Sequence, residues 1–219
     1  MLKNKQNNTI NKMPKLLNNK SKHDATAIES VSIVKHNRNV QTMEYKIKYD
    51  HFMQQLREYK SLMKQFVMTS RFNTATLKEN RDFVENQPNI KCVYCSPDPI
   101  AQHIPIDSLM FVLEMNNDTN LISGIGLVRN HAHMHKYSVY KEQMYNRYIY
   151  YGKHHIARNE MNENEERIMK VFDILCFTGN KHMKRGQGIK SFPVETLFKC
   201  SNTIDLVAFI GNMFKSRMQ

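Results

Sequence analysis

The chain has 219 residues, of which 41% are hydrophobic, and this suits one ordinary domain with a disordered portion. Its 32 Lys and Arg residues exceed its 20 Asp and Glu residues, and the formal charge of +12 favours a polyanionic partner such as RNA, DNA or an acidic membrane surface. Four cysteines are too few for a disulfide scaffold. No run of about 18 apolar residues predicts a membrane span. We therefore expect an intracellular protein, in the cytoplasm, nucleus or a virion, that is neither secreted nor bound to membrane.

The N-terminal part divides into an irregular segment and a periodic one. Residues 1–43 are rich in Asn and Lys and show no sustained periodicity, which predicts a disordered basic arm. From Tyr45 to Phe66, apolar residues recur at steps of three and four, as in a long amphipathic helix. We expect residues 44–219 to form a single domain.

The middle of the chain has the pattern of β-strands. Residues 91–95 predict a short strand, and residues 109–115 are apolar on both faces, as in a buried strand. The polar residues 116–120 predict a turn, after which residues 121–129 return as the second strand of a hairpin. Residues 145–151, rich in tyrosine, predict a further strand.

The second strand of this hairpin carries Gly124 and Gly126 on the same face. Glycines at alternate positions leave room for another backbone or a ligand to approach. Two interpretations are open at this point: a tightly coiled strand of a barrel, or the floor of a pocket.

The C-terminal third predicts helices around a basic loop. A helix is expected from Asn162 to Phe177, and a last helix is expected to begin after Asn202 or Thr203. Between them, the loop of residues 178–192 contains three glycines and a group of basic side chains. The basic side chains are Lys181, His182, Lys184, Arg185 and Lys190.

Glycines allow backbone N–H groups to converge on an anion, and the basic side chains add positive charge. The loop therefore predicts a site for a phosphate or a polynucleotide backbone. Its spacing fits neither a P-loop nor a dinucleotide fingerprint. The alternative is an exposed, solvated basic turn.

Aromatic and basic residues also alternate along the tyrosine-rich strand and just beyond it. This composition suits base stacking combined with phosphate neutralisation, although tyrosines also pack well in strands for structural reasons alone. The candidate nucleic-acid contacts of this segment are Arg147, Tyr148, Tyr150, Lys153, His154 and Arg158.

The Cys92-Val-Tyr-Cys95 segment has the spacing of one zinc knuckle, but no second such pair exists. On a strand the two cysteines would point to opposite faces, which favours inert buried thiols over zinc. His131, His133 and His135 could chelate a metal, with a solvated loop as the favoured alternative. Because no Ser-His-Asp, Cys-His or two-metal arrangement is evident, we expect a non-catalytic protein without a cofactor, and zinc stays the open alternative.

Three segments together resemble PUA-like domains, the group that includes PUA, ASCH, EVE and YTH modules. They are the hairpin of residues 107–129, the strand of residues 145–151, and the F-T-G-N-K-H…R-G-Q-G-I-K segment of residues 177–190. The chain also resembles poorly characterised proteins of large nucleocytoplasmic DNA viruses. The resemblance implies an α+β fold, with a small mixed β-barrel flanked by a long N-terminal helix and by C-terminal helices.

The same resemblance implies nucleic-acid binding, in some members with recognition of a modified base in a pocket. The chain has no tryptophan, so Tyr148, Tyr150 or Phe111 would replace the tryptophans of an aromatic cage. We expect non-catalytic binding of RNA or DNA through the basic loop and the aromatic strand. The alternatives are a structural or interaction component of a viral assembly and, third, a metal-dependent hydrolase.

Overall fold

The computed structural model describes the chain from Ser21 to Met218, with side chains described from residue 42 onward. The chain divides into two compact units, Met1–Gln55 and Leu56–Gln219. Among the described residues, the strands all belong to the second unit, which therefore contains the features that bear on function.

The first helix, α1, runs without interruption from Ser21 to Leu62. It confirms the predicted helix but begins well before Tyr45, inside the segment expected to be a disordered arm; residues 1–20 of that arm lie outside the described residues. Residues 15–87 contain neither Gly nor Pro, so nothing in the sequence interrupts a helix there. The helix ends at Leu62, and Phe66, the last residue of the predicted helix, belongs to strand β1 (Gln65–Phe72).

The strands of the second unit form two sheets, in the orders β7-β4-β3-β1-β8 and β2-β6-β5. Within the described residues the sheets do not close into a barrel, so the chain is a mixed α+β protein without the expected barrel. The remaining strands are β2 (Cys92–Ser96), β3 (Leu109–Asn116), β4 (Leu121–Arg129), β5 (His133–Met134), β6 (Tyr148–Gly152), β7 (His154–Ala157) and β8 (Ile189–Ser191).

The five-stranded sheet is built around β3. It pairs in antiparallel register with β4, which confirms the predicted hairpin, and in parallel register with β1. Successive side chains of β3 point to opposite faces, so Val112 enters one hydrophobic core and Phe111 the other. Phe111 stacks on Phe214 with ring centroids 5.5 Å apart, which makes it a core residue and not a pocket residue.

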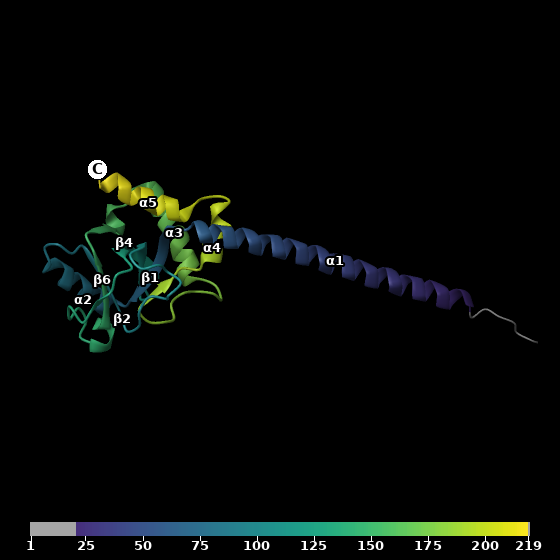
Figure 1. Cartoon of the computed structure of the whole chain (residues 1–219), viewed down its shortest axis with the longest axis horizontal. Helices are drawn as coiled ribbons and strands as arrows, with labels where there is room; N and C mark the ends of the chain where they lie inside the picture. Colours follow the sequence, from purple (N-terminus) through teal and green to yellow (C-terminus); the bar gives the residue numbers. More distant parts are fainter. Residues whose placement is uncertain (1–20, 219) are drawn as a thin grey trace, which may run out of the picture. The chain divides into compact units, whose positions relative to one another are not determined.

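Helices cover this arrangement on both sides (Figure 1). Leu77, Phe83 and Val84 of α2 pack on the core shared with the three-stranded sheet, whereas α3, α4 and α5 contribute to the second core. The helices are α2 (Thr74–Glu85), α3 (Glu163–Phe177), α4 (Val194–Ser201) and α5 (Leu206–Arg217), with short 3₁₀ turns at Gln143–Arg147 and Arg158–Glu160. The predicted helix of residues 162–177 is confirmed as α3, with Asn162 as its N-cap, while α5 is capped by Asp205 instead of Asn202 or Thr203.

The two glycines of β4 face a buried polar network. A Cβ added to Gly126 would lie 2.0 Å from the hydroxyl oxygen of Tyr94, and one added to Gly124 would lie 3.0 Å from Oε2 of Glu114. The space left by the glycines is therefore filled by side chains of the protein itself. Neither interpretation drawn from the sequence, a coiled barrel strand or a pocket floor, describes this use of the glycines.

Glu114 is the centre of that network and is fully buried. Its carboxylate accepts a hydrogen bond from Tyr94 at 2.8 Å, lies 3.1 Å from Nε2 of His155, and is paired with Arg81 of α2. Burial acts to raise the pKa of Glu114, but the hydrogen bond and charge of His155, the charge of Arg81 and the Tyr94 hydroxyl outweigh it and lower the pKa. The carboxylate is therefore ionised, and it joins β3 to α2, β2 and β7.

We predict that Glu114→Gln lowers the free energy of unfolding at pH 7 by about 3–5 kcal/mol, because Arg81 loses its buried counter-charge. Since the folded-state pKa lies below the ordinary value of about 4.3, the carboxylate stabilises the fold fully above that value. Its contribution is lost as the pH falls through the folded-state pKa. Urea unfolding between pH 7 and pH 3 measures both effects.

The matched control is Glu85→Gln, which removes an exposed carboxylate at the end of α2. It should change the unfolding free energy by no more than about 0.5 kcal/mol. Equal effects of the two substitutions would show that the Glu114 network does not support the fold.

Candidate functional site

The basic loop between α3 and β8 is shaped by its glycines. Gly179, Gly186 and Gly188 have φ angles of 74°, 109° and 62°, a region that other residues rarely adopt. The sequence pattern of three glycines among cations therefore corresponds to a backbone that needs glycine at each of these positions.

Two side chains on or next to the five-stranded sheet form hydrogen bonds with carbonyl groups of the loop. Arg71, on β1, donates from Nε to the carbonyl oxygen of Met183. Asn117, in the turn after β3, donates from Nδ2 to the carbonyl oxygen of Lys184 at 3.1 Å. With these carbonyl groups bonded, the backbone N–H groups of residues 185–187 donate to no other described residue. They remain available to an acceptor outside the chain.

The loop displays most of its cations to solvent. Lys181, Arg185 and Lys190 are exposed, whereas His182 and Lys184 are half-buried. Nδ1 of His182 is buried without a hydrogen-bond partner among the described residues. Four of the five predicted basic side chains are thus on this loop together with free backbone donors, and the fifth, Lys190, lies on β8 directly after it.

The loop lies beside the start of β6. A Cβ added to Gly188 would be 2.1 Å from Oγ of Ser96, and Ser96 pairs with Tyr148 in the three-stranded sheet. Tyr148 is half-buried, and the guanidinium carbon of the exposed Arg147 lies 5.4 Å from the centre of its ring. Ser96 therefore lies between Gly188 of the loop and Tyr148, and Arg147 immediately precedes Tyr148 in the chain.

Other residues predicted to contact nucleic acid either lie away from the basic loop or form hydrogen bonds within the protein. Tyr150 is buried, and its hydroxyl accepts a hydrogen bond from the backbone N–H of Ile100 at 3.2 Å. Lys153 and His154 are exposed at the opposite end of β6, next to Cys92 and Leu127.

Arg158 forms ion pairs and hydrogen bonds within the protein. Its guanidinium pairs with Glu166, lies 2.9 Å from Oδ2 of Asp173, and donates to the carbonyl oxygen of Ile122 at 2.9 Å. Burial acts to lower the pKa of Arg158, but these two carboxylates outweigh it and raise the pKa. Arg158 therefore connects the 3₁₀ turn Arg158–Glu160 to α3 and β4 and has no donor left that points to an external phosphate.

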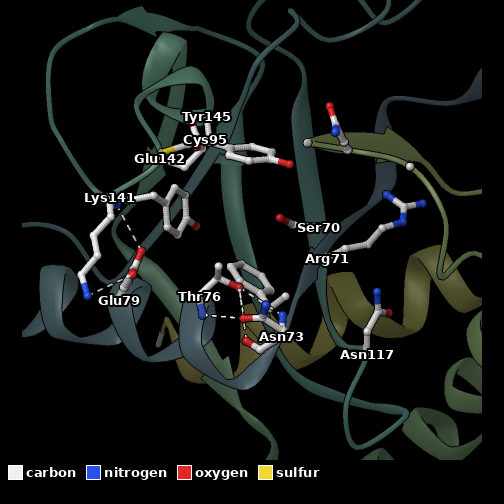
Figure 2. Close-up of a pocket in the computed structure, with 15 residues that line it drawn as sticks. Ser70, Arg71, Asn73, Thr76, Glu79, Cys95, Asn117, Lys141, Glu142 and Tyr145 are labelled. Carbon is white, nitrogen blue, oxygen red and sulfur yellow. Dashed lines mark hydrogen bonds and ion pairs between the residues drawn. The ribbon is translucent and has the colours of Figure 1, made fainter.

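A pocket of about 440 Å³ opens beside the loop (Figure 2). It is bounded by Gly186–Gly188, by the end of β1, by the first turns of α2 and by residues 140–145. This pocket is distinct from the one predicted at Gly124 and Gly126, and the sequence pattern did not predict it. Arg71, Asn73 and Glu79 line it from β1, from the N-cap of α2 and from α2 itself, a part of the chain for which the sequence pattern predicted no element.

The cysteines have no arrangement that indicates zinc. Cys92 and Cys95 are buried free thiols, and burial raises the pKa of both, so both are protonated at neutral pH. Cys92 donates to the carbonyl oxygen of His154, while Cys95 lines the pocket. Within residues 42–218, no group of three or more His, Cys, Asp or Glu side chains is placed to hold a metal ion.

His131 and His133 lie side by side on the surface, with ring centroids 5.1 Å apart. His133 also stacks on Tyr151 at 4.6 Å, and burial together with the nearby Lys136 and His131 lowers the pKa of His133. These histidines form an aromatic group and not a ligand set.

Comparisons with protein-family models, with curated proteins and with solved structures find no match to this chain. None of the helices in the described part of the chain combines the length and apolar character that a membrane crossing requires. A function must therefore be inferred from the geometry and charge of the loop and pocket.

We predict that Gly188→Ala destabilises the protein more than Gly179→Ala does. Both positions have positive φ, so each substitution should cost about 1–2 kcal/mol in backbone strain. At Gly188 the new Cβ would also meet Ser96 and Pro97, whereas nothing lies within 4 Å at Gly179. Thermal unfolding of the two variants measures the difference, and equal shifts in Tm would contradict the close packing of the loop on β2.

Proposed function

We propose that the Leu56–Gln219 unit binds RNA or DNA without catalysing a reaction on it. The observation that carries the proposal is that Gly188 of the basic loop packs against Ser96, the strand partner of Tyr148. Phosphate groups would meet cations and backbone N–H groups on the loop, and a base would stack on the accessible part of Tyr148.

Electrostatics supports the same proposal. A protein that neutralises phosphates with Lys and Arg releases condensed counterions, and this release drives much of nucleic-acid binding. The loop and the adjoining strand β8 together offer Lys181, Lys184, Arg185 and Lys190 within ten residues of sequence. The formal charge of +12 of the whole chain adds long-range attraction to any polyanion.

The proposed interface is narrower than the sequence pattern indicated. Tyr150 and Arg158 are left out because the hydroxyl of the first and the guanidinium of the second are bonded within the protein. Lys153 and His154 are left out because they lie at the far end of β6. A PUA-like relationship belongs to the proposal and rests on the sequence resemblance, since the strands form two sheets without a closed barrel in the described residues.

We predict that reversing the charges of Lys184 and Arg185 to Glu weakens binding to single-stranded oligonucleotides of any sequence by roughly tenfold or more at 0.1 M salt. The slope of log K against log salt concentration should become less negative by about 1.4, because two phosphate contacts are lost. Fluorescence anisotropy titrations of RNA and DNA at several salt concentrations measure both quantities.

A control variant makes the same change in net charge elsewhere. Lys91→Glu with Lys153→Glu alters two exposed lysines at the opposite end of β6 from the loop. The proposal expects this variant to retain most of the affinity. Equal loss in both variants would reduce the binding to general charge attraction, and a role as a structural or interaction component of an assembly would then be favoured.

A further inference from the structure

The pocket beside the basic loop has two chemically different ends. Figure 2 shows Arg71 and Asn117 on one side of it and Glu79 and Lys141 on the other. Ser70, Asn73 and Thr76 lie between these ends and offer hydroxyl and amide groups. A ligand that matches the pocket must therefore differ in chemistry from one end to the other.

The Arg71 end offers unused hydrogen-bond donors. The guanidinium of Arg71 donates from Nε to Met183, and its Nη1 is buried without a partner. Its Nη2 is not buried and bonds to no described residue, so Nη2 is the donor open to a ligand, and Arg71 pairs with no carboxylate among residues 42–218. Gly186 lies against this guanidinium, since a Cβ added to it would be 3.8 Å from Cζ. The N–H groups of Gly186 and Gln187 are also free of partners among the described residues.

A half-buried cation without a counter-charge favours an anion beside it, because a buried donor left without an acceptor costs about 1–3 kcal/mol. A phosphate matches the flat, forked donor set of arginine well, and backbone N–H groups add to its coordination. The Arg71 end of the pocket is therefore suited to a phosphate group.

The Glu79 end offers an acceptor next to aromatic side chains. Glu79 accepts from the backbone N–H of Lys141 at 3.3 Å, and its Oε1 lies 3.9 Å from Nζ of Lys141. The Lys141 side chain is 91% exposed, so this ion pair contributes little to stability. A ligand can therefore replace Lys141 as the partner of Glu79. Tyr140 and the half-buried Tyr145 border the same side of the pocket.

An ionised carboxylate only accepts hydrogen bonds, so it selects a base with adjacent N–H donors. Guanine presents two such donors side by side, the ring N1–H and the exocyclic amino group. Adenine and cytosine place a ring acceptor next to the amino group, and the N–H of uracil lies between two carbonyl oxygens. Of the four bases, guanine fits Glu79 best.

We infer that this pocket binds a guanosine 5′-phosphate unit, with the phosphate at Arg71 and the loop N–H groups and with the guanine at Glu79 beside Tyr145. The volume of about 440 Å³ falls within the range of small-molecule sites. The inference rests on the proposed function, which it extends by naming the nucleotide that the interface selects. The unit can be a free nucleotide or part of a nucleic-acid chain.

Calorimetric titration of the full chain with guanosine 5′-phosphate, guanosine, adenosine 5′-phosphate and uridine 5′-phosphate tests the inference. Guanosine 5′-phosphate should bind at least about tenfold more tightly than guanosine, which lacks the phosphate, and than the uridine nucleotide. Glu79→Gln should remove the preference for guanine, while Glu85→Gln, an equal charge change on the same helix but outside the pocket, should leave it unchanged.

The phosphate end is tested by Arg71→Lys, which keeps a charge but loses the forked donor set, and by Arg71→Met. Both should reduce the difference in affinity between guanosine 5′-phosphate and guanosine. Because Arg71 also holds the loop, Tm is measured for each variant. If neither variant folds, the Glu79 variant and the four ligands decide the question.

Oligonucleotides distinguish the sources of the guanylate. A strand with a 5′-phosphorylated terminal G is compared with its 5′-hydroxyl counterpart and with a strand that has G only in its interior. Binding of oligonucleotides with salt dependence, but of no mononucleotide and with no preference for G, would overturn this inference and leave the proposed function intact. Binding of mononucleotides with equal affinity for all bases, unaffected by Glu79→Gln, would overturn the assignment of guanine.

Discussion

The candidate site depends on the two hydrogen bonds by which Arg71 and Asn117 fix the backbone of the basic loop. Arg71 and Asn117 donate to the carbonyl oxygens of Met183 and Lys184, whereas the N–H groups of residues 185–187 donate to no described residue. A loop without these contacts would be a flexible run of cations with only general attraction for polyanions. With them, the cations, the free N–H groups and the mouth of the pocket keep a defined arrangement.

The buried Glu114 network supports the opposite wall of the pocket. Its partner Arg81 and the pocket residue Glu79 both belong to α2, so the ion pair that fixes α2 on β3 also positions Glu79. The glycines of β4 matter for the same reason, because any side chain at Gly126 would displace Tyr94 from the network. Stability and the proposed recognition of a ligand are thus connected through one buried carboxylate.

Local patterns predicted the local structure well. The alternation and turn residues around β3 and β4 predicted the hairpin, and the glycines among cations predicted a specialised loop at Thr178–Gly188. The pocket was not predictable in this way, since its walls come from segments more than a hundred residues apart, such as Arg71 and Gly186. Composition alone also placed Arg158 in the nucleic-acid site, although its guanidinium is bonded to two carboxylates of α3 within the protein.

The most direct test of the account is a titration of the isotope-labelled full chain with single-stranded RNA and DNA, followed by backbone amide NMR. The account predicts that the largest shifts occur at the amides of residues 185–187, whose N–H groups are free of partners within the described chain, and around Tyr148. Shifts spread evenly over the exposed lysines, or concentrated near Lys91 and Lys153, would contradict it.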